Sequence, residues 1–326
     1  MATTTPPPDA VKPDDDATTW RATGRGGDAI FLGLSRLAAF TIMLALAGVG
    51  VFLFLEGFDA FSLEPEAYAE GGGATTFLGY VGPLVFGTAL AAVVALIIAV
   101  PLAIGIALFI SHYAPKRLAG PIAYVMDLLA AVPSVVYGLW GGSALAGALK
   151  PVIIWLGDHL NWLPFFSADK VAVNGRTMLT AGIVLAVMIL PIIAAICREV
   201  FSRTPRLHEE AALALGATRW EMIRYAVFPY SRSGVVSAVM LGLGRALGET
   251  MAVAMVLPST FVVTLSLIGE SSPRTIAANI ASNYKESTPQ TQSLLIATGL
   301  VLFAFTFAVN FLARYIAGRN DRKLAR

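Results

Sequence analysis

The stretch Ser202-Arg-Thr-Pro-Arg-Leu-His-Glu-Glu-Ala-Ala-Leu-Ala-Leu-Gly-Ala-Thr-Arg-Trp-Glu-Met-Ile-Arg-Tyr-Ala-Val-Phe-Pro-Tyr230 is a polar interruption between two long apolar runs. Its local chemistry predicts two short helices joined by a turn. Thr204 is suited to cap the first helix, with Pro205 at the first helical position, where a missing N–H costs nothing. Gly216 then ends that helix.

The second short helix is predicted to begin with a capping box. In this motif Thr218 and Glu221 each satisfy an orphan backbone donor at the helix start. Pro229 is expected to close the helix. Two short helices joined by a turn would suggest DNA binding in a soluble protein, but the flanking apolar runs place this pair on a membrane face. We therefore expect no nucleic-acid partner.

Composition makes the chain an integral membrane protein. Of its 326 residues, 56% are hydrophobic and only 13% are charged. The single cysteine, Cys197, excludes an internal disulfide and is expected to be a packed thiol. A bilayer span needs about 20 apolar residues. Six segments approach this length, and the expected spans are 29–55, 81–110, 121–149, 178–196, 235–257 and 294–315.

The basic residues predict the orientation. With the N-terminus in the cytoplasm, 17 of the 23 Lys and Arg fall in cytoplasmic segments, including five arginines within or just before 202–230, and five fall outside. Both termini are then cytoplasmic. Residues 1–28, rich in Thr, Pro and Asp, are expected to form a disordered cytoplasmic tail before a transmembrane domain at 29–326. The outer loops 56–78, 155–166 and 258–290 either receive an extracytoplasmic partner or only connect spans.

Two charged residues fall inside the predicted fifth span. Arg245 and Glu249 lie well within its apolar run, and intramembrane ions are functional candidates by default. Four residues apart on one helix, they would share a face, with Glu249 holding Arg245 in place. The guanidinium offers a planar fork of donors suited to a phosphate-like anion. The alternative is an internal ion pair that only packs the bundle.

The predicted third span supplies further polar candidates. Asp127 would need a partner inside the membrane, either Arg245 or a backbone donor. Pro133 frees a backbone carbonyl, and Ser134 and Tyr137 add hydroxyls, so this segment is a candidate lining of an anion pathway. A kink with locally satisfied polar groups explains the same residues equally well.

Several kinds of site are absent from the sequence. No phosphate-binding Gly-x4-Gly-Lys-Ser/Thr loop occurs, so ATP is not expected to bind this chain. His112, His159 and His208 are isolated and are expected to be solvated rather than to bind a metal. No hydrolase signature occurs. We therefore expect a transport subunit without cofactor or metal, and not an enzyme.

The residues also carry a family resemblance. Glu210, Ala211 and Ala212, followed by Gly216 and Pro229, resemble the EAA loop of ABC importer permeases, which docks onto the ATPase; Ala226 and Phe228 stand where that pattern has Ile and Leu. With Arg-Ala-Leu-Gly-Glu-Thr (245–250) and Pro-Ser-Val-Val-Tyr-Gly-Leu-Trp-Gly (133–141), the chain resembles the PstC family, the permease subunits of phosphate ABC importers. The resemblance covers residues 29–320.

The resemblance implies an all-α type I ABC importer transmembrane domain in a bacterial plasma (inner) membrane. It implies a second permease (PstA-like), an ATPase dimer (PstB-like) carrying ATP and Mg, an extracytoplasmic phosphate-binding protein (PstS-like), membrane lipid, and phosphate moved by alternating access. It also implies that Arg245 and Glu249 are required for phosphate movement. Sulfate or molybdate transport, a secondary anion transporter and a non-transporting scaffold remain alternatives at this point.

Overall fold

The computed structural model describes residues 25–69, 73–168, 170–258 and 260–324, and these residues are helical without a β-sheet. Short 3-10 turns follow α1 and α12, and five-residue π-helical turns follow α3, α5 and α9. The helices are α1 (Arg25–Gly57), α2 (Pro65–Ala69), α3 (Phe77–Leu108), α4 (Lys116–Ala131), α5 (Ser134–Trp140), α6 (Ala146–His159), α7 (Met178–Ser202), α8 (Arg206–Ala214), α9 (Arg219–Met222), α10 (Phe228–Leu247), α11 (Met251–Val256), α12 (Ile276–Asn283) and α13 (Pro289–Leu324).

Six helical stretches of the described chain are long and apolar enough to cross a membrane, as the sequence predicted. They are 27–61, 77–113, 134–159, 178–202, 219–247 and 289–315. The chain divides into two compact units, residues 1–49 and 50–326. Of the predicted tail, residues 1–24 lie outside the described residues, and α1 begins at Arg25.

The core of the larger unit is built on α3, α7 and α10, and small residues let these helices approach closely. Gly182 of α7 lies against Val94 of α3, and Gly242 of α10 lies against Ile193 of α7. Cys197 is fully buried in this core, as expected of a packed thiol. Without a hydrophobic force between helices in lipid, such close packing supplies much of their attraction.

The third span is not where the sequence placed it. The prediction joined 121–149 into one helix, but Val132 is extended (φ −65°, ψ 130°) and separates α4 from α5. The cause is Pro133, which disfavours the helical conformation of the residue before it. The membrane-length stretch therefore begins at Ser134 and continues through a π turn into α6.

The fifth span also ends earlier than predicted. The expected helix at 235–257 stops at Leu247, and a new short helix, α11, begins at Met251. Gly248 caps α10, and the intervening residues leave the helical hydrogen-bond ladder. The break puts Arg245 in the last turn of one helix and Glu249 between two helices, so the predicted shared helical face does not exist.

Candidate functional site

Arg245 is exposed at the break between α10 and α11. The three glycines near it in sequence differ in how closely they pack against other helices. Gly242 packs on α7, whereas a side chain at Gly244 would meet nothing within 4 Å and one at Gly248 would meet only the Gly244 carbonyl. Close packing therefore applies to Gly242, whereas Gly244 and Gly248 leave open space on the helix next to Arg245 in sequence.

Glu249 has a different environment from Arg245. Its side chain is 8% exposed, and its carboxylate accepts a hydrogen bond from the backbone N–H of Ala252 at 3.2 Å. This contact satisfies a donor that the start of α11 would otherwise leave unpaired. Within the described chain no ion pair joins Glu249 to Arg245, so the expectation that Glu249 holds Arg245 is not met.

Tyr137 comes from α5 and lies within electrostatic range of Arg245. It is 6% exposed, and its hydroxyl donates to the Leu129 carbonyl at 2.8 Å, across the Pro133 break. This bond fits the alternative of a kink with locally satisfied polar groups. The neighbouring Gly138 packs directly on Ala252 of α11, so α5 and the break that carries Glu249 are in contact. Ser134, half-buried, begins the same helix.

Asp127 is separate from this group. It lies on α4, before the Pro133 break, and its side chain is exposed. It makes no hydrogen bond or ion pair with any residue that the structure describes. The structure therefore brings Arg245, Glu249 and Tyr137 to one region around the α10–α11 break and leaves Asp127 outside it.

The polar interruption at 202–230 forms α8, α9 and the start of α10. Gly216 has φ +87° and ends α8, as predicted, and the capping box of Thr218 and Glu221 is present in full. Two details of the prediction are wrong. Helix α8 is preceded by Pro205, and the Thr204 hydroxyl is buried without a hydrogen-bond partner. Pro229 does not close a helix.

Instead, Pro229 lies in the first turn of α10, directly after the π-helical turn Ile223–Val227. A proline inside an α-helix clashes with the carbonyl four residues earlier, and a wider π turn relieves this clash. Helices α9 and α10 therefore form one continuous rod. The segment predicted to dock onto an ATPase is thus joined to the fifth span without a loop.

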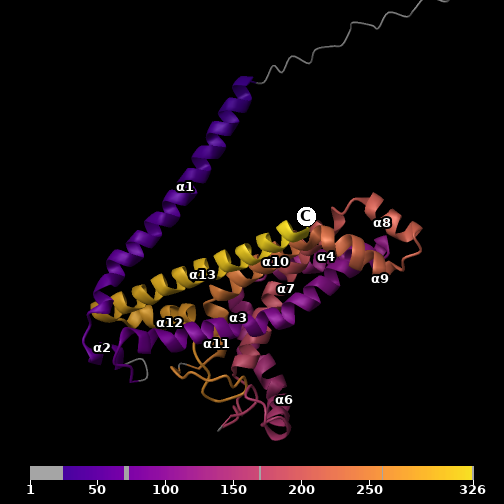
Figure 1. Ribbon diagram of the computed structural model, residues 1–326. Coiled ribbons are helices and arrows are strands. Elements are labelled where there is room, and N and C mark those ends of the chain that lie inside the picture. The colour runs from indigo at the N-terminus through magenta and orange to yellow at the C-terminus, as the bar shows by residue number, and fades with distance from the viewer. Residues whose placement is uncertain (1–24, 70–72, 169, 259, 325–326) are drawn as a thin grey trace, which may run out of the picture. The chain divides into compact units, whose positions relative to one another are not determined.

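The predicted coupling residues lie on the surface of α8 and its C-terminal turn. Glu210, Ala211 and Gly216 are exposed, and Ala212 is half-buried. Figure 1 shows α8 and α9 at one end of the bundle, away from α6. An exposed rigid segment joined to a span is suited to receive a partner and to transmit its motion.

One histidine was misjudged from sequence. His112, expected to be solvated, has a side chain that is only 9% exposed, and its Nε2 lies 3.6 Å from Glu209 Oε1 on α8. Its Nδ1 lies 2.7 Å from the Ser111 hydroxyl. In the part of the chain that the structure describes, no cluster of His, Cys, Asp or Glu could hold a metal.

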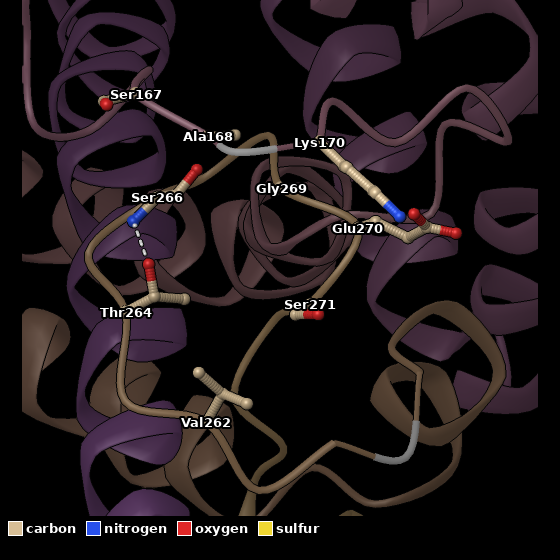
Figure 2. Close-up of a pocket in the computed structure, with 9 residues that line it drawn as sticks. All are labelled: Ser167, Ala168, Lys170, Val262, Thr264, Ser266, Gly269, Glu270 and Ser271. Carbon is tan, nitrogen blue, oxygen red and sulfur yellow. Dashed lines mark hydrogen bonds between the residues drawn. The ribbon is translucent and has the colours of Figure 1, made fainter.

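A cavity of about 340 Å³ lies between two long loops, 160–177 and 257–275 (Figure 2). The loops are bonded through their backbones, with Leu267 donating to Phe165 and Glu270 donating to Lys170. Lys170 and Glu270 line the cavity together with several hydroxyl side chains. Of the three predicted outer loops, 258–290 thus contributes most of the lining of a polar cavity.

Sequence reasoning also missed Arg274, which was counted only as an outer-loop cation. It is 4% exposed, and it follows a loop pressed against α3, where the Arg274 carbonyl faces Gly87. Burial lowers the pKa of its guanidinium, and Tyr80 acts in the opposite direction. A polar loop in the sequence gives no sign of such burial, because the burial arises from contact with a distant helix.

Comparison with known proteins identifies the family. The family described as "Binding-protein-dependent transport system inner membrane component" matches residues 99–322, more than half of the chain. The chain belongs to this family. It is an importer permease and a multi-pass membrane protein, as the EAA-like segment and the apolar helices predicted.

Relatives match over nearly the whole chain. The phosphate transport system permease protein PstC 2 of Mycobacterium tuberculosis is 45% identical over 305 residues, covering 90% of this chain and 93% of that protein. The phosphate transport system permease protein PstC of Mesorhizobium japonicum is 38% identical over 325 residues, covering 96% of each. A crystal structure of a bacterial ABC transporter involved in alginate import superposes with a TM-score of 0.49 at 17% identity, covering 89% of this chain and 99% of that one.

Proposed function

We propose that this chain is the permease subunit of an ATP-driven phosphate importer and forms part of the anion pathway. Its full-length relatives are named as phosphate transport permeases. The observation that carries the proposal is the environment of Arg245. Arg245 is exposed at a helix break, in a segment whose glycines at 244 and 248 leave open space, and no carboxylate of the described chain pairs with it.

This environment suits transient binding of an oxyanion. A planar guanidinium binds phosphate oxygens with two parallel hydrogen bonds, which an internal ion pair would prevent. Ser134 begins the short helix that also carries Tyr137, whose hydroxyl is already donated to the Leu129 carbonyl and therefore holds the Pro133 break rather than the anion. Glu249 maintains the break by capping α11, so its role in the site is to position Arg245 and α11 relative to each other.

The coupling segment leads to the partners of the complex. Residues 202–230 dock onto a PstB-like ATPase dimer that carries ATP and Mg, and the continuous α9–α10 rod transmits closure of that dimer to the α10–α11 break. A PstA-like second permease covers the exposed face of Arg245. With both termini in the cytoplasm, the ordered loops of Figure 2 face outward and receive a PstS-like phosphate-binding protein.

The test is ATP-dependent uptake of labelled phosphate, with sulfate as competitor, in vesicles that contain the whole complex. Arg245→Gln should assemble but lose uptake, whereas the matched control Arg36→Gln, at an exposed position on α1, should transport normally. Normal uptake by Arg245→Gln would contradict the site assignment. Full competition by sulfate would mean that the substrate is a broader class of oxyanions rather than phosphate alone. Uptake without the ATPase would favour a secondary transporter.

A further inference from the structure

Among the residues whose side-chain burial the structure describes, Arg274 and Glu249 are the only charged ones that are buried. Glu249 has a backbone donor, as described above. Arg274 lacks a comparable partner. Its Nη1 donates to Asn279 Oδ1 at 3.5 Å, the long limit of a hydrogen bond, and its Nε has none. A guanidinium carries five donors, and the Nε donor of Arg274 is buried without a hydrogen bond.

The charge of Arg274 is also uncompensated. No carboxylate of the described chain lies within ion-pair distance of it. A buried charge without a partner is strongly unfavourable, so buried arginines are normally paired. The position of Arg274 is therefore typical of a residue that is completed by an anion from outside the chain.

A hydrogen-bond network leads from Arg274 to a cavity. Asn279 Oδ1 accepts the hydrogen bond from Arg274, and Asn279 Nδ2 donates to the Tyr80 hydroxyl at 3.0 Å. The same Oδ1 accepts from Asn283 Nδ2 at 2.9 Å. Tyr80 and Asn283 both line a cavity of about 300 Å³. Arg274 does not line this cavity itself but is connected to its wall through the side chain of Asn279.

The rest of the cavity wall carries hydroxyl groups, of which Ser287 donates to the Tyr284 carbonyl and Thr288 and Thr291 share one hydrogen bond. The hydroxyls of Ser287, Thr288 and Thr291 line it, and Thr288 caps the start of α13 by accepting from the Thr291 N–H. The N-terminus of a helix carries partial positive charge, which favours an anion. One wall residue opposes an anion, the exposed carboxylate of Glu286. An anion bound in this cavity therefore needs the positive charge of Arg274 to offset the nearby carboxylate of Glu286.

Helix α3 separates this cavity from the coupling segment. Tyr80 lies in its first turn and His112 follows its last, and 32 residues at 1.5 Å each place them roughly 48 Å apart. Since His112 contacts α8, the cavity lies near the opposite end of α3. In the orientation proposed above, that end is the outer one.

We propose that this cavity, with Tyr80, Asn283 and Thr291 at its wall and Arg274 behind Asn279, is an entry site for a tetrahedral oxyanion, separate from Arg245. The anion accepts hydrogen bonds from the second Asn283 amide hydrogen and from the Thr288–Thr291 hydroxyl pair, and Arg274 balances its charge through Asn279. The choice of phosphate as the anion, and of the outer side, rests on the proposed function.

The test measures binding of labelled inorganic phosphate to the purified whole complex, without ATP and without the binding protein, in the Arg245→Gln background. Arg274→Gln should weaken the remaining binding by about tenfold or more, because it removes the balancing charge. Arg274→Lys keeps the charge and should retain most of it. Glu286→Gln removes the opposing charge and should tighten binding by about two- to fivefold.

A purely structural role of Arg274 would give a different pattern. In that case Arg274→Lys would be as damaging as Arg274→Gln, and Glu286→Gln would leave binding unchanged; either result overturns the proposal. If Arg274→Gln does not assemble, Thr291→Val and Glu286→Gln must still shift binding in opposite directions. If sulfate rather than phosphate is bound and imported, the proposed function fails, and the entry site stands only if the same variants shift sulfate binding.

Discussion

His112 Nε2 lies 3.6 Å from Glu209 Oε1, and this contact joins the end of α3 to α8. The ion pair of Arg203 with Glu199, by contrast, lies within one turn at an exposed surface. The His112 contact thus differs in kind, because it connects two elements that are distant in sequence. It ties the predicted ATPase-docking helix to a membrane span other than the one that α9 continues into.

We expect His112→Ala to weaken coupling rather than assembly. Loss of a partly buried contact between two polar side chains is worth about 1 kcal/mol, which corresponds to roughly a fivefold change in an equilibrium between two positions of α8. The measurement is the number of anions imported per ATP hydrolysed in the reconstituted complex. Glu199→Ala, which breaks only the exposed pair, is the control and should leave this ratio unchanged.

A double-mutant cycle makes this prediction specific. If the contact itself matters, His112→Ala and Glu209→Ala should each lower the ratio, and the double variant should lower it no further. Additive losses would show that the two residues act independently and that the contact does not couple α8 to α3.

Gly138 is a sharp test of the contact between α5 and α11. A Cβ at this position would lie 2.9 Å from both Ala252 Cα and Met255 Sδ, so a side chain must push the helices apart. Gly138→Val should destabilise the complex by about 1–3 kcal/mol and reduce transport, because α11 follows Glu249 directly. Thermal unfolding and uptake provide the readouts.

The matched control is Gly105→Ala in α3, where a Cβ would meet nothing within 4 Å. Replacing a helical glycine at an open position stabilises a helix by about 0.4–1 kcal/mol. Gly138→Val with the same stability and transport as the wild type would show that α5 and α11 do not pack in the working complex.

Gly216 tests the turn between α8 and α9. Its φ of +87° is strained for side chains with a Cβ, although a Cβ there would meet no neighbouring atom. Gly216→Ala should therefore cost about 1–2 kcal/mol through backbone strain alone, and Gly216→Asn should cost less. The measurement is the affinity of the permease for the ATPase subunit. Equal affinities for the wild type and both variants would show that this turn does not shape the docking surface.

Features set by neighbouring residues were predictable from the sequence. The capping box of Thr218 and Glu221 and the left-handed Gly216 follow from local hydrogen bonding and sterics, and the six spans follow from apolar length. Features set by distant contacts were not. The burial of Arg274 depends on α3, and the contact of His112 depends on α8, neither of which leaves a local pattern.

The breaks within the apolar runs were the hardest part to predict. Pro133 was recognised as a kink, but the length of the apolar run gave no reason to end one span there and start another. At Pro229 the opposite error occurred, because a π turn let the helix continue. The spacing of Arg245 and Glu249 suggested that they share one helical face. In the structure the Glu249 carboxylate instead accepts a hydrogen bond from a backbone N–H of the next helix, α11.

Glu249 offers the last test, which separates its capping role from its charge. Glu249→Gln keeps an oxygen that can accept the Ala252 N–H, so the complex should assemble with near wild-type stability. Glu249→Ala removes the acceptor and should cost about 1 kcal/mol, seen as a lower thermal midpoint. If the role is positional, Gln should retain far more transport than Ala. Equal loss in both variants, with assembly intact, would mean that the negative charge itself is needed, so that Glu249 acts on the path of the anion as well as on the geometry of α11.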